Sequence, residues 1–104
     1  MSGEARLEDC NTLEEVRAHI DLLDKAIVPL LCERNHYVQQ AAKIKGDVDV
    51  VRVPVRIEGV VSKVRAIALE RGTDPDVVEA IYRAMIEVNI ALEKRQITDP
   101  DVTS

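Results

Sequence analysis

The feature that most limits how this chain can fold is a helical pattern that runs without a glycine from Thr12 to Lys45. Asn11-Thr12 followed by Glu15 is typical of a capping box at the start of a helix. A helix of this length extends roughly 50 Å, whereas a compact domain of about 100 residues has a radius of gyration of about 13 Å. We therefore expect the helix to be too long to bury its apolar stripe within its own chain. The stripe has spacings of three and four residues and consists of Leu13, Val16, Ile20, Leu23, Ile27 and Leu30.

Pro29 lies inside this pattern and removes one backbone hydrogen bond, so we expect either a kink or a break into two helices. The apolar period keeps its phase on both sides of Pro29, which favours a kinked single helix. The following segment, 46–54, alternates valine with polar residues, but no partner strand is evident, and we predict a loop.

Two further helices follow this loop. Pro54 suits the start of the first, which Gly72 ends. Asp74-Pro75 suits the start of the last, which we expect to run to about Gln96 before a flexible tail, 97–104. For the last helix we predict an apolar side formed by Val77, Val78, Ile81, Ala84, Met85, Val88 and Leu92.

Three helices with one overlong member predict an all-α chain that completes its core by pairing with a second copy across a two-fold axis. The length of 104 residues fits a single domain, 1–104, with a core from about residue 10 to residue 96.

The composition excludes several classes of function. A net charge of -5 disfavours nucleic acid as a partner, and an aromatic content of 2% leaves no platform for stacking bases. No apolar run approaches the roughly 20 residues that span a bilayer, and the N-terminal residues lack a secretory pattern. We expect a cytoplasmic protein with reduced thiols and no metal, because His19 and His36 have no ligand cluster at metal-binding spacing.

Two cations interrupt the helix surface that should pack. Arg34 falls where the stripe requires a core residue, and Lys45 lies eleven residues later, three helical turns away on nearly the same face. A buried charge needs a partner, which is either an internal carboxylate such as Glu79 or Glu93, or a bound anion, unless the long side chain snorkels to water near the helix end. Arg17 poses a similar question, since an ordinary surface pair with Asp21 explains it as well.

At this point the stretch LEEVRAHIDLLDKAIVPLLCERNHYVQQAAKIKG resembles the first helix of the all-helical chorismate mutases. The shared motif is an arginine, then Ile-Asp, a leucine-rich stretch, a Glu-Arg pair, and a lysine eleven residues after that arginine. The resemblance covers residues 10–96. It is closest to the branch that contains isochorismate pyruvate lyases, because of the entry Glu8-Asp9-Cys10 and of Tyr37-Val38.

The resemblance implies an intertwined homodimer with two shared active sites and no cofactor. Arg34 and Lys45 would bind a small dicarboxylate within one chain, and Arg17 would reach in from the other. Glu93 occupies the position where the family usually has a glutamine that donates a hydrogen bond to the substrate. An ionised carboxylate cannot donate, so Glu93 must carry a proton to take that role. Asn89, on the same side of the last helix, is a further candidate for binding substrate.

The chain departs from the family pattern in its second helix, where Pro54 and Val55 stand in place of an acidic residue and an arginine that lie near the substrate's ring hydroxyl. Arg52 or Arg56 are candidates to substitute for them. The favoured function is chorismate mutase, an isomerase of aromatic or salicylate-related metabolism. The alternatives are isochorismate pyruvate lyase, and a non-catalytic helical dimer that binds a carboxylate ligand or a partner protein.

Overall fold

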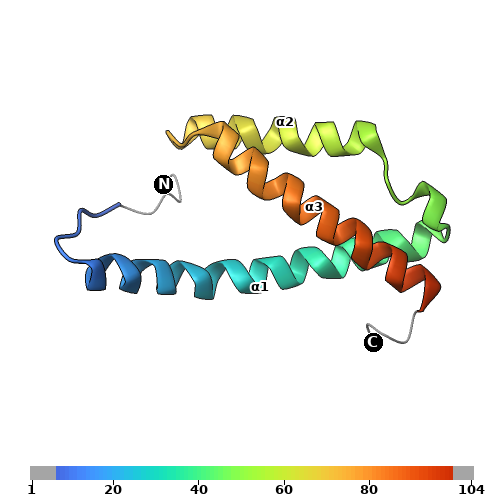
Figure 1. Cartoon of the computed structure of the whole chain (residues 1–104), viewed down its shortest axis with the longest axis horizontal. Coiled ribbons are helices and arrows are strands. Elements are labelled where there is room, and N and C mark those ends of the chain that lie inside the picture. Colours follow the sequence, from blue (N-terminus) through green and yellow to red (C-terminus); the bar gives the residue numbers. More distant parts are fainter. Residues whose placement is uncertain (1–6, 100–104) are drawn as a thin grey trace, which may run out of the picture. The chain divides into compact units, whose positions relative to one another are not determined.

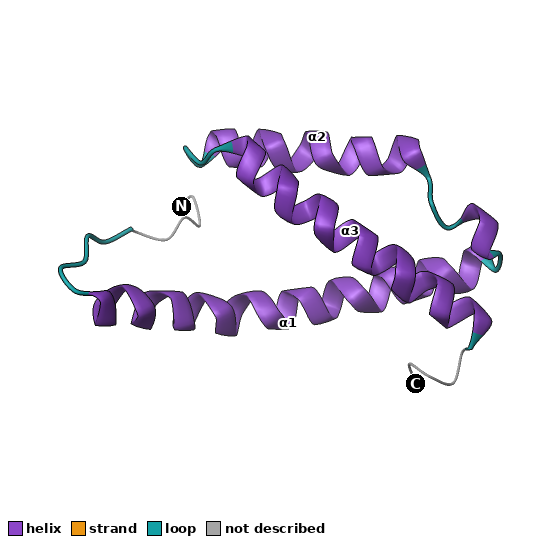
Figure 2. Ribbon diagram, viewed as in Figure 1, coloured by secondary structure: helices purple, strands orange, loops and turns teal. Residues whose placement is uncertain are grey.

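The structure, a computed structural model, describes residues 7–99. This part contains three α-helices, α1 (Leu13–Lys45), α2 (Pro54–Glu70) and α3 (Pro75–Thr98), and one short 3-10 helix, η1 (Val48–Val50). Figure 2 shows helices and loops over the described residues and no strand, which confirms the all-α prediction. Over these same residues no helix combines the length and the apolar character needed to cross a membrane.

The N-terminus of α1 is capped as its sequence predicts. The backbone N–H of Glu15 donates to Oγ1 of Thr12 at 3.1 Å, and the backbone N–H of Asn11 donates to Oε2 of Glu15 at 3.3 Å. The helix continues through Pro29 without interruption, so the single-helix prediction is confirmed over the two-helix alternative, while the kink stays a prediction. Gly46 ends α1 with a φ of 67°, a backbone conformation that favours glycine.

The chain divides into two compact units between Arg34 and Asn35. In the described part of the first unit, every residue of α1 from Leu13 to Glu33 is exposed. The apolar stripe is included, with Leu13 at 67%, Ile20 at 50% and Leu30 at 63% relative exposure. A stripe of exposed large apolar side chains along a helix is typical of an interaction surface.

The second unit contains the end of α1, η1, and the pair α2 and α3, which Gly72 connects with a φ of 72°. In Figure 1 α2 and α3 meet at this turn and diverge toward the end of α3. The side chain of Asp74 caps α3 by accepting from the backbone N–H of Asp76 at 2.9 Å, as Asp74-Pro75 predicts. The core consists of Val51, Val61, Ile86 and Ile90, with Ile57, Val60 and Ile97 packed against it.

Three details of the second unit differ from the sequence-based prediction. The segment 46–54 is not all loop, because η1 forms where the Asp47 side chain accepts from the N–H of Asp49 at 2.9 Å. Helix α3 continues through Ile97 to Thr98, so the predicted tail begins later, and its residues 100–104 lie outside the described part. The predicted apolar side of α3 is mostly not the buried one.

On α3, the stripe that packs within the chain is not the predicted apolar side. Val77, Ile81 and Val88 are 52–67% exposed. The buried residues of α3 are Ile86, Asn89, Ile90, Glu93 and Gln96. Helix α3 packs against α2 and η1 within this unit, so the stripe that it buries is set by these neighbours, and three of its five members are polar.

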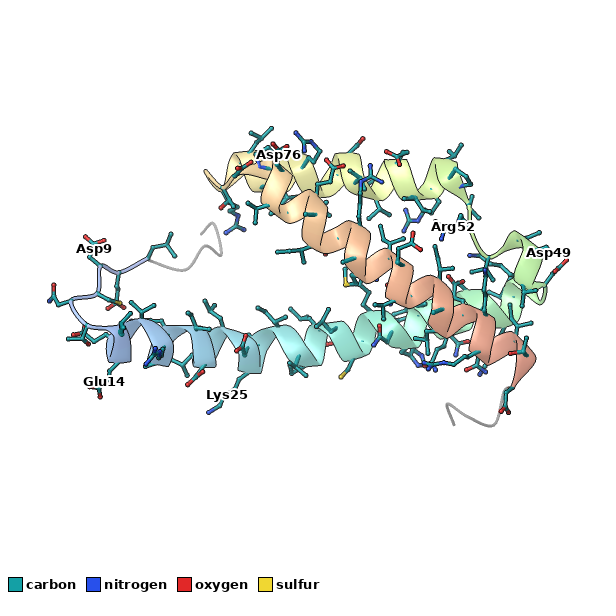
Figure 3. The ribbon with its side chains drawn as sticks, in the orientation of Figure 1. Asp9, Glu14, Lys25, Asp49, Arg52 and Asp76 are labelled. Carbon is teal, nitrogen blue, oxygen red and sulfur yellow. The ribbon has the colours of Figure 1, made fainter. Side chains whose placement is uncertain are left out.

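An ion-pair chain connects α2 with α3. Arg65 contacts Asp76 at 2.9 Å and Glu79 at 2.7 Å, and Arg83 contacts Glu79 at 2.6 Å and Glu58 at 2.9 Å. Asp76, at the α2–α3 turn, is labelled in Figure 3. Hydrogen bonds from Arg83 and then from Arg65 hold the pKa of Glu79 below its usual value, and that from Arg83 does the same for Glu58.

Candidate active site

The candidate site is built on the buried polar stripe of α3, which consists of Asn89, Glu93 and Gln96. These residues are 6–7% exposed and follow one another at spacings of four and three residues, so they lie on one face of the helix. Buried polar groups are costly unless they are hydrogen-bonded. Each member of the stripe has a partner on the last three turns of α1, at Asn35, Lys45 and Gln39 respectively.

The central pair joins a cation and a carboxylate. Nζ of Lys45 lies 3.0 Å from Oε1 of Glu93 and donates a second hydrogen bond, of 2.9 Å, to the backbone carbonyl of Val51. The Lys45 side chain is 27% exposed and the Glu93 side chain 8%. The internal carboxylate of Glu93 is therefore a partner of Lys45, which confirms that alternative for this residue.

Both members of this pair keep hydrogen-bonding capacity. A lysine ammonium has three donors, and two are occupied by Val51 and Glu93. The second carboxylate oxygen of Glu93, Oε2, has no hydrogen-bond partner among residues 7–99, and it is not fully buried. A ligand oxygen can therefore accept from the third N–H of Lys45, whereas Oε2 of Glu93 can accept from a ligand O–H or, when protonated, donate to a ligand oxygen.

Amide pairs flank the central pair. Nδ2 of Asn89 donates to Oδ1 of Asn35 at 3.3 Å, and Nε2 of Gln39 donates to Oε1 of Gln96 at 3.4 Å. The sequence analysis missed Asn35 and Gln39. The available signal was their spacing of four residues on α1, followed three residues later by Ala42, which is 0% exposed.

Arg52 and Arg56 are not brought to the polar stripe. Arg52, labelled in Figure 3, makes a bidentate pair with Glu87 of α3, at 2.8 and 2.6 Å. The hydrogen bond with Glu87 raises the pKa of Arg52 and lowers that of Glu87. Arg56 is exposed on the first turn of α2. Arg52 has a carboxylate partner in Glu87, and the expectation that Arg52 or Arg56 takes the place of the missing helix-two residues stays a prediction.

Arg17 and Arg34 lie on α1 in the first unit. Arg17 is exposed and forms no ion pair with another described residue, so the predicted surface pair with Asp21 is not formed. Arg34 is half-buried. Their roles in substrate binding stay predictions, with Arg34 acting within one chain and Arg17 coming from a second copy.

A separate surface pocket of about 230 Å³ lies between the start of α2 and α3. Two arginine–carboxylate pairs line it, together with apolar side chains, and the residues are Arg52, Pro54, Ile57, Glu58, Arg83, Ile86 and Glu87. Lys45 and Glu93 are not among them. Within residues 7–99, no three His, Cys, Asp or Glu side chains group in a way that could hold a metal ion.

The arrangement around Lys45 suits the binding of a small anion. An ammonium held in a fixed direction and partly removed from water attracts negative charge more strongly than a solvated one. The carboxylate beside it limits this attraction while it is ionised, and becomes a hydrogen-bond donor when it is protonated. The site can thus hold an anionic substrate and stabilise charge that develops on one of its oxygens.

Comparison with known proteins identifies the relatives of this chain. The family model described as chorismate mutase type II matches residues 16–94. A chorismate mutase from Methanocaldococcus jannaschii is 30% identical over 88 residues, which cover 84% of this chain and 89% of that protein. An isochorismate pyruvate lyase from Pseudomonas aeruginosa is 32% identical over 84 residues, which cover 81% of this chain and 83% of that protein.

Proposed function

Because the chain belongs to the chorismate mutase type II family, we propose that it is a chorismate mutase, which rearranges chorismate to prephenate without a metal or an organic cofactor. The reaction breaks the ether C–O bond of the substrate while a new C–C bond forms, with no covalent intermediate on the protein. The protein then has two tasks, which are to hold the compact conformer of the substrate and to stabilise negative charge on the ether oxygen.

The observation that carries the proposal is the Lys45 ammonium. Val51 and Glu93 fix its direction, and one N–H remains for a ligand. In our proposal this N–H donates to the ether oxygen of chorismate, where the charge develops. Because the donor is already oriented, it needs no reorganisation during the reaction, and a donor of this kind typically contributes about 10²–10³ in rate.

Glu93 is proposed to donate the second hydrogen bond to the ether oxygen, through Oε2. Donation requires the protonated form of the Glu93 carboxyl group. The bound substrate is a dianion, and its charge disfavours a second negative charge beside it. We therefore propose that Glu93 takes up a proton when chorismate binds.

The remaining cations are proposed to bind the two carboxylates of the substrate. Arg34 precedes Lys45 by three turns on α1, and Arg17 would come from the α1 of a second copy. Guanidinium groups suit this task because they bind carboxylates through two parallel hydrogen bonds. The exposed apolar stripe of α1 supports a homodimer in which each chain completes the site of the other.

The second candidate is isochorismate pyruvate lyase, which is favoured by the relative of that name at 32% identity. One preparation assayed with both substrates decides between the two. Prephenate formed from chorismate at a rate well above that of a Lys45→Met preparation supports the mutase, whereas salicylate and pyruvate formed from isochorismate support the lyase. If neither product forms above the rate without protein, both proposals are wrong, and a non-catalytic helical dimer is favoured.

A further inference from the structure

We propose that Asp47 is a positioning residue, which holds the short helix η1 in the conformation that brings the backbone carbonyl of Val51 to the Lys45 ammonium. This inference rests on the proposed function, because it gives Asp47 an effect on the donor that acts in the reaction. Asp47 is exposed, and in this proposal it does not touch the substrate. It acts through Val51 and Lys45.

The first step of the argument is the place of Lys45 at the end of α1. Lys45 is the last residue of the helix, and the chain leaves the helical conformation directly after it, at Gly46 with a φ of 67°. The flexible stem of a lysine leaves the direction of its ammonium open. Nζ contacts Glu93 of α3 at 3.0 Å and the carbonyl of Val51 at 2.9 Å. Its direction therefore depends on the conformation of residues 46–51.

The second step concerns what holds Val51. This residue is 2% exposed and belongs to the core, together with Val61, Ile86 and Ile90. The packed side chain fixes where Val51 lies. It does not fix the direction of the carbonyl, because the peptide plane is set by the backbone dihedrals on either side of it. The conformation of the turn that leads into Val51 therefore decides where the carbonyl points.

The third step is that Asp47 begins this turn. Its Oδ1 accepts from the backbone N–H of Asp49 at 2.9 Å, and its backbone carbonyl accepts from the N–H of Val50 at 3.2 Å. The next bond, from the N–H of Val51 to the carbonyl of Val48, is longer, at 3.4 Å. Backbone hydrogen bonds in 3-10 turns have poorer geometry than those of α-helices. We therefore expect η1 to depend strongly on the side-chain cap from Asp47.

A direct charge effect is the competing explanation, because Asp47 is an acid two residues after Lys45. The carboxylate of Asp47 forms no ion pair with another described residue, and salt screens the interactions of an exposed charge. Asparagine keeps the accepting oxygen and removes the charge. Asp47→Asn therefore separates the cap from the charge.

The first experiment is steady-state kinetics on the substrate that the two-substrate assay identifies. We expect kcat of Asp47→Ala to fall about 5-fold, the factor by which loss of one side-chain cap typically changes an equilibrium. KM should change less than about 2-fold, because guanidinium groups elsewhere bind the carboxylates. Asp47→Asn should restore most of kcat. If Asp47→Asn is as slow as Asp47→Ala, the cap is not the cause and the inference is wrong.

The matched control is Asp49→Ala in the same turn. It removes a neighbouring carboxylate, labelled in Figure 3, but keeps the backbone N–H that donates to Asp47. We expect kcat and KM to match those of the wild type. A loss in Asp49→Ala equal to that in Asp47→Ala would show that any acid removed from this turn has the same effect, which overturns the role of the cap.

A double-variant cycle distinguishes positioning from a general loosening of the fold. If Asp47 acts through Lys45, Asp47→Ala lowers kcat when Lys45 is present and has no further effect in a Lys45→Met protein. Equal factors in the two backgrounds overturn the inference, because a merely structural role does not depend on Lys45.

A second readout does not depend on turnover. The rate at which acetic anhydride acetylates Lys45 is followed by mass spectrometry of the peptides, with the exposed Lys43 as internal reference. In Asp47→Ala the Lys45 rate should rise relative to that of Lys43, because the amine is held less by the Val51 carbonyl. Asp47→Asn and Asp49→Ala should keep the wild-type ratio. An unchanged ratio in Asp47→Ala contradicts the inference.

The two levels of the proposal fail in different ways. If the wild type converts neither chorismate nor isochorismate, the proposed function is wrong, and the effect of Asp47 on the reaction falls with it. If the wild type is active and Asp47→Ala matches it in both kcat and Lys45 acetylation, the function stands and the role of Asp47 is wrong.

Discussion

Lys45 and Glu93 form one pair, so removing either residue changes the environment of the other. The ammonium of Lys45 is fixed by Glu93 and by the carbonyl of Val51. Without Lys45, Glu93 stays buried at 6% exposure with no cation beside it among the described residues. We therefore expect a substitution in this pair to change both the activity and the stability of the protein.

We predict that Lys45→Met lowers kcat by about 100-fold or more, because it removes an oriented donor to the oxygen where charge develops. The control is Lys43→Met, which removes an exposed lysine two residues earlier on the same helix and should leave kcat unchanged. Steady-state kinetics with both variants tests this. Equal kcat values for Lys45→Met and wild type would remove Lys45 from the reaction.

The same substitution should destabilise the fold by about 1–3 kcal/mol, the typical cost of leaving one buried polar partner unpaired. Adding Glu93→Gln should recover part of the stability, since the double variant has no unpaired charge, but none of the activity. Urea denaturation of the wild type and of these two variants measures their stabilities, and steady-state kinetics measures their activities.

Glu93→Gln alone tests the proposed protonation. In the wild type, kcat should decrease as pH rises, because Glu93 loses the proton that it donates to the substrate. The amide of glutamine donates at every pH, so the variant should have a nearly flat profile between about pH 5 and about pH 9. A wild-type rate that does not depend on pH, or a variant with the same slope as the wild type, contradicts the role of Glu93.

At the residue scale, the sequence predicts the inward cation and its partner but not the neighbours of the pair. The eleven-residue spacing from Arg34 and the required compensation of a charge lead to Lys45 and to Glu93 as one of two candidate partners. The spacing of Asn35 and Gln39 is a weaker signal, since an amide on a helix is equally compatible with a solvated face. Only the packing of α1 on α3 shows that they are paired with Asn89 and Gln96.

At the scale of elements, the α2–α3 pair is connected by ion pairs that respond to acid. Glu79 is paired with both Arg65 and Arg83, which lower its pKa from the ordinary value of 4.5. A carboxylate with a lowered pKa in the folded state contributes stability at neutral pH, and this contribution is lost as pH falls through the folded pKa.

We predict that Glu79→Gln lowers the Tm by a few degrees at neutral pH, and that the difference from wild type shrinks as the pH falls well below 4.5. Glu70→Gln, at an exposed glutamate with no ion pair to another described residue, is the matched control and should melt like the wild type at each pH. Thermal melts followed by circular dichroism over this pH range provide the measurement. A Glu79→Gln difference that stays constant down to low pH would show that the ion pairs are not its source.

The helix starts could be predicted because local chemistry decides them. The buried face of a helix could not be predicted, because the neighbouring elements decide it. The capping box at Thr12 and the prolines at the starts of α2 and α3 locate the helix starts, because their effect depends on a few adjacent residues. The buried face of α3 was not predictable, since Val77, Ile81 and Val88 form an equally regular apolar stripe. The choice between the two stripes depends on where α2 and η1 lie, and the residue spacing along α3 gives no information about their position.

At the scale of the whole molecule, the exposed stripe of α1 supports a dimer. We predict that Ile20→Asp, which places a charge in the stripe, gives a monomer and abolishes activity, because a charge is costly to bury in an apolar interface. Val55→Asp, at a valine of α2 that is 85% exposed, should leave both properties unchanged. Light scattering after size-exclusion chromatography reports the mass. A fully active monomer of either variant would exclude a site shared between two chains.

A crystal structure with a bicyclic dicarboxylate that mimics the transition state would show directly whether these cations meet on one ligand. We predict that Lys45 and Arg34 of one chain and the partner's Arg17 bind the same molecule, with Lys45 Nζ and Glu93 Oε2 on its ether oxygen. A structure in which each of these cations is neutralised by the protein's own carboxylates, with no ligand between them, would contradict it.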